Sequence, residues 1–170
     1  MRTRILLTAA ADGDDDSDTD PTAAWASDFC SAITTWTDEL QTVTSQFSDT
    51  SNLSQDGLQS ASDDVRAATE SLVDDLRGLG SPETDGGEEI QSALDTLSTT
   101  LETESTSVEE TVEGISGLTG IPSAITAVTA SLSAMGTAFS TALQTIENAD
   151  VESELQNALE ESPECADITS

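Results

Sequence analysis

Apolar side chains recur along this chain at alternating spacings of three and four residues, a pattern that places them on one face of an α-helix. The pattern begins at Trp25 and occurs in four successive runs. No segment shows the strict alternation of apolar and polar residues that is typical of strands. The four stripes are, in order, Trp25, Phe29, Ile33, Trp36, Leu40, Val43 and Phe47; Leu58, Ala61, Val65, Ala68, Leu72, Leu76 and Leu79; Ile90, Leu94, Leu97, Leu101, Val108, Val112 and Ile115; and Ile121, Ile125, Val128, Leu132, Met135, Phe139, Leu143 and Ile146.

Turn-forming residues separate these runs. Residues 48–55 are mostly polar, glycines and a proline crowd residues 78–87, and glycines recur every third residue from 114 to 120. Pro122 follows at once, and it either belongs to the third turn or occupies the first turn of the fourth helix. The third stripe lapses at Glu104 or Ser105, where we expect a looser core. Residues 148–150 could interrupt the fourth stripe, which Val151, Leu155 and Leu159 continue.

Four amphipathic helices joined by short turns predict an all-α fold, since each helix packs most readily against its predecessor in the chain. We expect an elongated, antiparallel up-down-up-down four-helix bundle over residues 23–166, with coiled-coil-like packing and crossing angles near about 20°. Helices of about 25 residues would make it on the order of 40 Å long. The competing architecture is a longer two-helix hairpin that dimerises into the same kind of bundle.

The first 22 residues differ from the rest of the chain. Arg2 and Arg4 precede the apolar run Ile5–Ala11, and an Asp-rich stretch follows. This order is that of a short, degenerate export signal followed by an acidic disordered spacer, although a disordered cytosolic N-terminus would look similar. A lipidated protein would carry a cysteine near residue 12, where this chain has Asp12. Residues 167–170 are expected to be a disordered tail.

The charge of the chain excludes two classes of partner. It has 34 acidic residues, four arginines, no lysine and no histidine, for a net charge of -30. Nucleic acid and anionic membrane surfaces are bound through clustered Lys and Arg, so we expect neither to be a direct partner. Such acidity suits a salt-rich cytoplasm, but it also suits an exported protein from a GC-rich genome.

Cys30 and Cys165 are the two cysteines of the chain. An even number of antiparallel helices returns the chain to the end at which it started, so the predicted fold brings both residues to one end of the rod. We therefore expect a disulfide between them, which implies an oxidising compartment. Two unconnected buried thiols are the alternative. Catalysis by a cysteine thiolate would need a histidine or lysine as base, and the chain has neither. A zinc site would need further soft ligands besides the two cysteines.

The sequence contains no glycine-rich phosphate loop and no metal-spaced set of cysteines or histidines. Adjacent carboxylates such as Asp63 and Asp64 point about 100° apart on a helix and indicate a solvated face rather than an acid and base pair. We therefore expect no catalytic residue, no cofactor and no metal site. Trp25, Phe29 and Trp36 are expected to pack in the core near the disulfide, with an exposed aromatic patch for a partner as the alternative.

Three stretches carry a resemblance to a known group: W-A-S-D-F-C-S-A-I-T-T-W, V-R-A-A-T-E-S-L-V-D-D-L-R-G-L-G-S-P and I-S-G-L-T-G-I-P-S-A-I, followed by the late cysteine. From Trp25 to Cys165 the chain resembles a group of small uncharacterised actinobacterial exported proteins and lipoproteins. The resemblance implies an extracellular or cell-envelope location, a helical bundle and no established activity. This chain departs from the lipoprotein members in lacking the acceptor cysteine.

These observations favour a non-enzymatic, exported or cell-envelope protein that acts as a binding or spacer module, with an unidentified protein or envelope partner. The alternative is a cytosolic acidic coiled-coil adaptor or dimer in a salt-adapted cell, with its cysteines reduced. An enzyme that uses carboxylates alone is a third reading. The sequence leaves open whether the protein is a monomer or a dimer.

The charge also generates a prediction about stability. Self-repulsion of the carboxylates opposes the compact state, and salt screens it over about 10 Å at 0.1 M. We expect the melting temperature, followed by circular dichroism, to rise as NaCl is added. A flat or falling melting temperature between low and high salt would contradict this expectation.

Overall fold

The computed structural model describes residues 20–48, 54–149 and 154–165 and is all-helical within these ranges. Its five α-helices are α1 (Pro21–Ser48), α2 (Gln55–Leu79), α3 (Gly87–Glu113), α4 (Ile121–Ala149) and α5 (Glu154–Glu161). Two short 3-10 segments, η1 (Leu118–Gly120) and η2 (Pro163–Cys165), complete it. The expected export signal and spacer fall outside the described residues up to residue 19, as does the expected tail at 167–170. The helical part begins at Pro21, two residues before the expected start.

The helix ends follow the turn signals of the sequence. Ser54 caps α2, because its side-chain oxygen accepts a hydrogen bond from the backbone N–H of Gly57 at 3.1 Å. Gly80 ends the same helix with a φ of 64°, a backbone conformation that favours glycine. Pro122 is the second residue of α4. It therefore occupies the first turn of the helix, where its missing N–H costs no intrahelical hydrogen bond.

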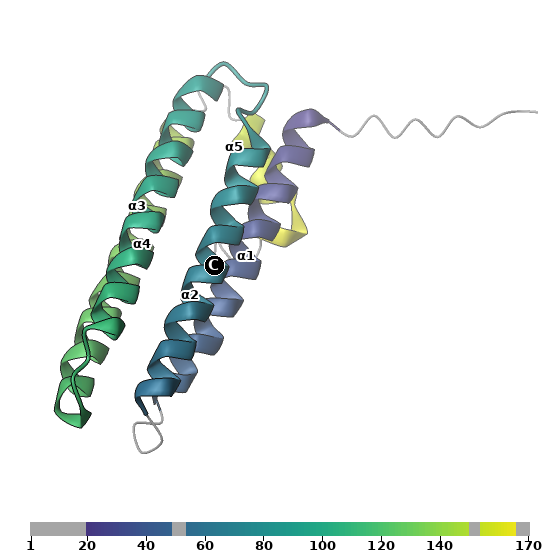
Figure 1. Ribbon diagram of the computed structural model, residues 1–170. Coiled ribbons are helices and arrows are strands. Elements are labelled where there is room, and N and C mark those ends of the chain that lie inside the picture. Colours follow the sequence, from purple (N-terminus) through teal and green to yellow (C-terminus); the bar gives the residue numbers. More distant parts are fainter. Residues whose placement is uncertain (1–19, 49–53, 150–153, 166–170) are drawn as a thin grey trace, which may run out of the picture.

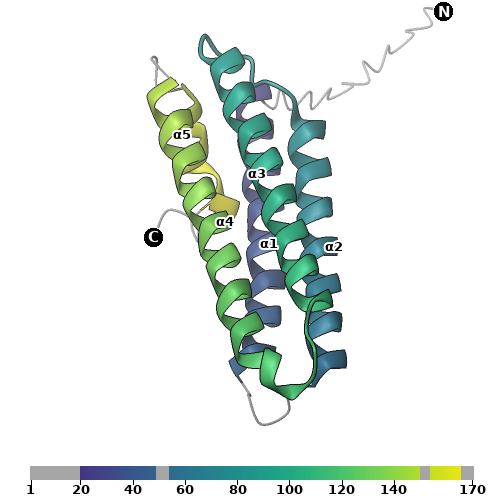
Figure 2. The same ribbon diagram turned by 60° about the vertical axis from the view of Figure 1, so that its left-hand side comes forward.

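The four long helices lie side by side, each packed against the next in the chain (Figures 1 and 2). Two tryptophans tie α1 to α2. The indole N–H of Trp25 donates to the carbonyl oxygen of Gly80 at 3.1 Å, and that of Trp36 lies 3.5 Å from the hydroxyl oxygen of Thr69. Contacts are extensive between α1 and α2, α2 and α3, and α3 and α4, whereas α1 and α4 approach one another much less closely.

Two ion pairs cross the outer surface between α2 and α3. The guanidinium of Arg77 lies 2.9 Å from the carboxylate of Glu102, and that of Arg66 lies 3.3 Å from Glu109. Arg66 also pairs with Glu70 one turn away at 2.9 Å. All of these side chains are at least about a third exposed, so water and salt screen the pairs and each contributes little to stability.

The apolar stripes form two clusters of buried residues. The larger contains residues from α1, α2, α3, α4 and α5 together with both cysteines. The smaller lies at the end of the molecule where α3 ends and α4 begins, and consists of Leu58, Val108, Val112, Ile115, Ile121, Ala124 and Val128. Ser105 takes the buried position at the lapse in the third stripe. Leu40, Leu132, Phe139 and Leu143 are only partly buried, and all four belong to α1 or α4.

The last described helix departs from the expected continuation of the fourth stripe. α4 ends at Ala149, and α5 is a separate short helix that packs against α1 (Figure 2). Leu155 of α5 is completely buried in the larger cluster, with Ala158 and Leu159 packed against it. At the same end a Cβ atom on Gly86 would collide with the backbone carbonyl of Ala149, so the loop after α2 and the end of α4 are in close contact.

The larger cluster generates a mutational prediction. Leu101 has no exposed surface, so Leu101→Ala leaves a cavity and should lower the free energy of unfolding by about 2 to 5 kcal/mol in urea denaturation. Thr103→Ala, on the exposed side of the same helix, is the control and should change it by less than about 0.5 kcal/mol. A loss at Leu101 no larger than the control would mean that this part of the stripe is not core.

Candidate functional site: the disulfide and the groove between α1 and α4

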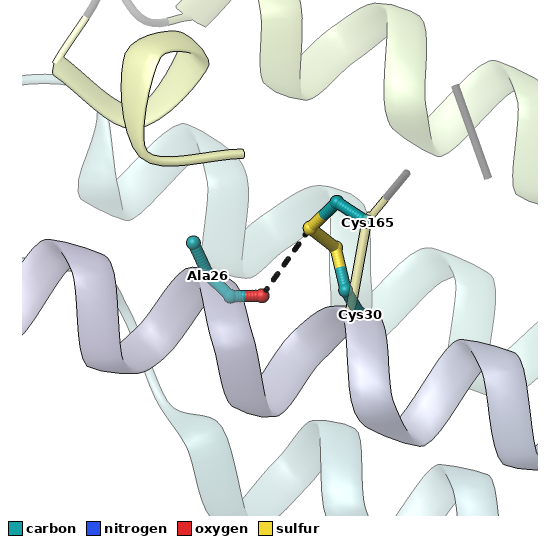
Figure 3. The surroundings of a disulfide bond; sticks show 3 residues. All are labelled: Ala26, Cys30 and Cys165. Carbon is teal, nitrogen blue, oxygen red and sulfur yellow. Dashed lines mark hydrogen bonds between the residues drawn. A yellow bond between two sulfur atoms is a disulfide. The ribbon is translucent and has the colours of Figure 1, made fainter. Parts of the chain in front are cut away.

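The structure brings together the two residues that the sequence singled out. The sulfur atoms of Cys30 and Cys165 lie at disulfide-bonding distance, with their Cα atoms 5.1 Å apart at a sequence separation of 135 (Figure 3). Cys30 is the tenth residue of α1, roughly 14 Å along that helix. The chain reaches it because α5 and η2 both pack along α1. The bridge is thus part-way along the first helix rather than at its very end.

The bridge is sealed from solvent. Cys30 is 2% exposed and Cys165 is 1% exposed. The carbonyl oxygen of Ala26, one turn before Cys30, lies 3.8 Å from the sulfur of Cys165, the contact dashed in Figure 3. A bridged sulfur carries no proton, so this contact becomes a hydrogen bond only with a reduced Cys165 thiol as donor. Reductants in solution would need a local opening of α5 or η2 to reach either sulfur.

Aromatic side chains from α1 lie in the same core cluster as the bridge. The rings of Trp25 and Phe29 are stacked, with centroids 5.2 Å apart and planes 8° from parallel. Trp25 and Trp36 are each 6% exposed and Phe29 is 1% exposed. The expectation that these residues are core is confirmed, and the alternative of an exposed aromatic patch is wrong.

A groove runs between α1 and α4, which contact one another much less than successive long helices do. Its volume is about 500 Å³, and large apolar side chains supply most of its lining. The contributing residues are Ile33, Thr34, Trp36, Thr37, Asp38 and Leu40 of α1 and Leu132, Gly136 and Phe139 of α4. Clefts between the helices of a bundle that combine apolar walls with few polar groups are typical binding sites.

Gly136 lies in the lining of this groove and in the middle of α4. A glycine inside a helix costs about 0.5 to 1 kcal/mol relative to alanine. A Cβ atom at this position would meet nothing within 4 Å, so close packing inside the protein is not the reason for the glycine. The absent side chain keeps this wall of the groove open.

Two larger hollows lie elsewhere and fit a site less well. One of 770 Å³ between α1 and α2 is lined in part by Asp28, Asp74, Asp75 and Glu83. All four acids are exposed, so this hollow is an acidic surface rather than a desolvated acid and base pair. The other, of 720 Å³ between α3 and α4, is lined mainly by small threonine and alanine side chains.

Within the described ranges, no group of three or more Cys, Asp or Glu residues could hold a metal ion. The pKa of Arg66 is raised by its hydrogen bond to Glu70 and by attraction to the carboxylates of Glu70 and Glu109. That guanidinium is on the surface between α2 and α3, away from the groove. No helix in the described part of the chain combines the length and apolar character needed to cross a membrane.

The sequence predicted the cysteine pair but not the groove. The spacing of Leu40, Leu132 and Phe139 predicts that all three belong to the core. Their partial exposure depends on the distance between α1 and α4, which periodicity does not report. The one available signal was Gly136, a poor helix former in the middle of a strongly periodic run.

Comparison with known proteins yields no relative: no family model, no curated protein and no solved structure matches the chain.

The geometry of the bridge predicts its contribution to stability. Joining residues this far apart restricts the unfolded chain, which on the chain-entropy estimate stabilises the fold by up to about 5 kcal/mol. We expect the double variant Cys30→Ala/Cys165→Ala to unfold at a lower urea concentration than the oxidised wild type. Dithiothreitol should destabilise the wild type and leave the double variant unchanged. Wild-type protein with both thiols alkylated after reduction, yet with an unchanged midpoint, would contradict this prediction.

Proposed function

We propose that the four long helices form an antiparallel up-down-up-down bundle with coiled-coil-like packing, and that α5 and the disulfide fasten its last segment to α1. The tryptophan contacts support antiparallel α1 and α2, because Trp25 meets Gly80 while Trp36, further along α1, lies near Thr69. The ion pairs support the same relation for α2 and α3, because Arg66 meets Glu109 while Arg77 meets Glu102. The loop at Gly86 beside Ala149 supports it for α3 and α4.

On this scaffold the protein acts as a non-enzymatic binding module that is exported and works outside the cell or at the cell envelope. The observation that carries the proposal is the buried pairing of Cys30 with Cys165, since disulfides persist in oxidising compartments and are rare in the cytosol. The order of positive, apolar and acidic residues at the start of the chain agrees with export. Neither observation calls for attachment to a membrane.

Binding is favoured over a pure spacer role by the groove between α1 and α4. A spacer needs length and rigidity, and gains nothing from an apolar groove or from a glycine that weakens a helix. An enzyme is disfavoured, because the chain lacks histidine and lysine and its two cysteines are paired with each other. The competing function is a cytosolic adaptor in a salt-adapted cell, which the net charge of -30 favours and in which both cysteines would be reduced.

One experiment separates these two functions. Cells of the source organism are fractionated in the presence of iodoacetamide without reductant, and the protein is digested and analysed by mass spectrometry. Export predicts a peptide in which Cys30 and Cys165 are cross-linked, recovered from the medium or envelope fraction. Recovery from the cytosol with both thiols alkylated would overturn the proposal and establish the adaptor's compartment.

A further inference from the structure

We propose that the groove between α1 and α4 docks a short, positively charged amphipathic helix from another protein. This inference deepens the proposed binding role and rests on it, but it does not depend on the compartment. The occupant presents two or three large apolar side chains to the groove and carries Lys or Arg on its flanks. Four properties of the molecule support it: the dimensions of the groove, the precedent of α5, the position of Gly136 and the charge around the opening.

The dimensions of the groove suit a helix of two to three turns. On α1 its apolar lining runs from Ile33 to Leu40, and on α4 from Leu132 to Phe139. Each stretch covers eight residues of helix, so its ends are seven residue steps or about 10.5 Å apart. Apolar residues at positions i, i+3 or i+4 and i+7 of a docked helix cover the same length. One stripe of such a helix would cover the partly exposed Leu40, Leu132 and Phe139, whereas Ile33 and Trp36 are almost completely buried already.

The protein already packs one short amphipathic helix on α1, although this helix is acidic and carries no basic residue. α5 has only eight residues, and it lays Leu155, Ala158 and Leu159 against the core cluster that also contains Ile33 and Trp36. Leu40, Leu132 and Phe139 are partly buried members of that same cluster. The groove is therefore continuous with a surface on which a short helix is already seated. A second short helix would cover the apolar edge that α5 leaves uncovered.

Gly136 points to close approach by the occupant. The helix tolerates a residue that costs about 0.5 to 1 kcal/mol at a position where alanine would meet no obstacle within the chain. Glycine at such a position lets another backbone come closer than any other residue would allow. A bound partner whose backbone lies where the Cβ atom would stand would explain why the helix has a destabilising glycine at position 136.

Charge complementarity selects a cationic partner. The lining contains Asp38 and no basic residue, and Glu39 is exposed next to it. From Ile121 to Ile146, α4 carries no charged residue at all. Arg66 and Arg77 are paired with carboxylates between α2 and α3. A second copy of this chain would bring another net charge of -30 to the groove, which disfavours the copy as occupant.

The test uses the full-length oxidised protein and a fluorescein-labelled peptide with leucines at i, i+3, i+4 and i+7 and lysines on the other face. Because any lysine-rich peptide is attracted to so acidic a protein, a scrambled peptide of the same composition measures non-specific binding. A third peptide carries glutamate in place of lysine. Fluorescence anisotropy at about 0.15 M NaCl, where charges are screened over about 8 Å, reports binding.

Gly136→Leu blocks the groove with a good helix former, and Gly78→Leu is the matched control. A Cβ atom at position 78 would also meet nothing within 4 Å, and this position lies in α2 outside the groove. We expect the amphipathic lysine peptide to bind wild type and Gly78→Leu at least about tenfold more tightly than Gly136→Leu, a difference of about 1.4 kcal/mol. The thermal melting of each variant shows that the fold is retained. We expect the scrambled and glutamate peptides to bind wild type no more tightly than the amphipathic lysine peptide binds Gly136→Leu.

Equal binding of the lysine peptide to wild type and Gly136→Leu would overturn the inference, as would equal binding of its scrambled form. A wild-type dimer in sedimentation velocity that Gly136→Leu dissociates would assign the groove to a second copy and overturn it too. The inference would also be overturned if the lysine peptide bound the Leu6→Glu variant more tightly than wild type, because this would indicate that the chain's own apolar N-terminal run competes for the groove. None of these binding results changes whether the Cys30–Cys165 cross-link is found in the exported protein. The proposal of export and the proposal of a docked helix can therefore fail independently.

Discussion

Packing of the apolar helical faces against one another is the interaction on which the rest of this structure depends, because it must hold together a chain whose charges repel. Burial of apolar surface contributes about 25 cal/mol per Å², and here leucine, isoleucine, valine and a few aromatic residues provide it. The surface supplies little help: only three ion pairs occur among the described residues, all of them exposed. A net charge of -30 favours solubility, while the repulsion between the acidic side chains opposes the compact state.

The same interaction explains how much of the fold could be read from the sequence. Helical periodicity located the four long helices, and the turn signals located their ends, because both are local properties of the chain. Pro122 is compatible with a turn or with the first turn of a helix, because its fixed φ and missing N–H suit both. The pairing of Cys30 with Cys165 followed from the expectation that the chain returns to its starting end. It required no knowledge of any side-chain contact.

What the sequence could not supply is the arrangement of elements that no short loop connects. Leu155 and Leu159 were expected to continue the stripe of α4 after an interruption, yet they belong to a separate helix that packs on α1. Periodicity identifies an apolar face but not the neighbour against which it packs. The groove between α1 and α4 is unpredictable for the same reason. Short connections join each long helix to the next, whereas α1 and α4 are the first and last of the four long helices and no short connection joins them. The partly exposed residues of this groove, Leu40, Leu132 and Phe139, could not be distinguished from core by their spacing.

The position of the disulfide has a consequence for the integrity of the chain. Every peptide bond between Cys30 and Cys165 lies within a single covalent ring that includes all or part of each α-helix. A protease that cuts once in any connection between the helices would therefore leave two fragments joined through sulfur. The apolar faces of both fragments would stay in contact, so the nicked molecule could retain its shape. In an environment rich in proteases, such a ring prolongs the working life of a small protein without any further stabilisation of its core.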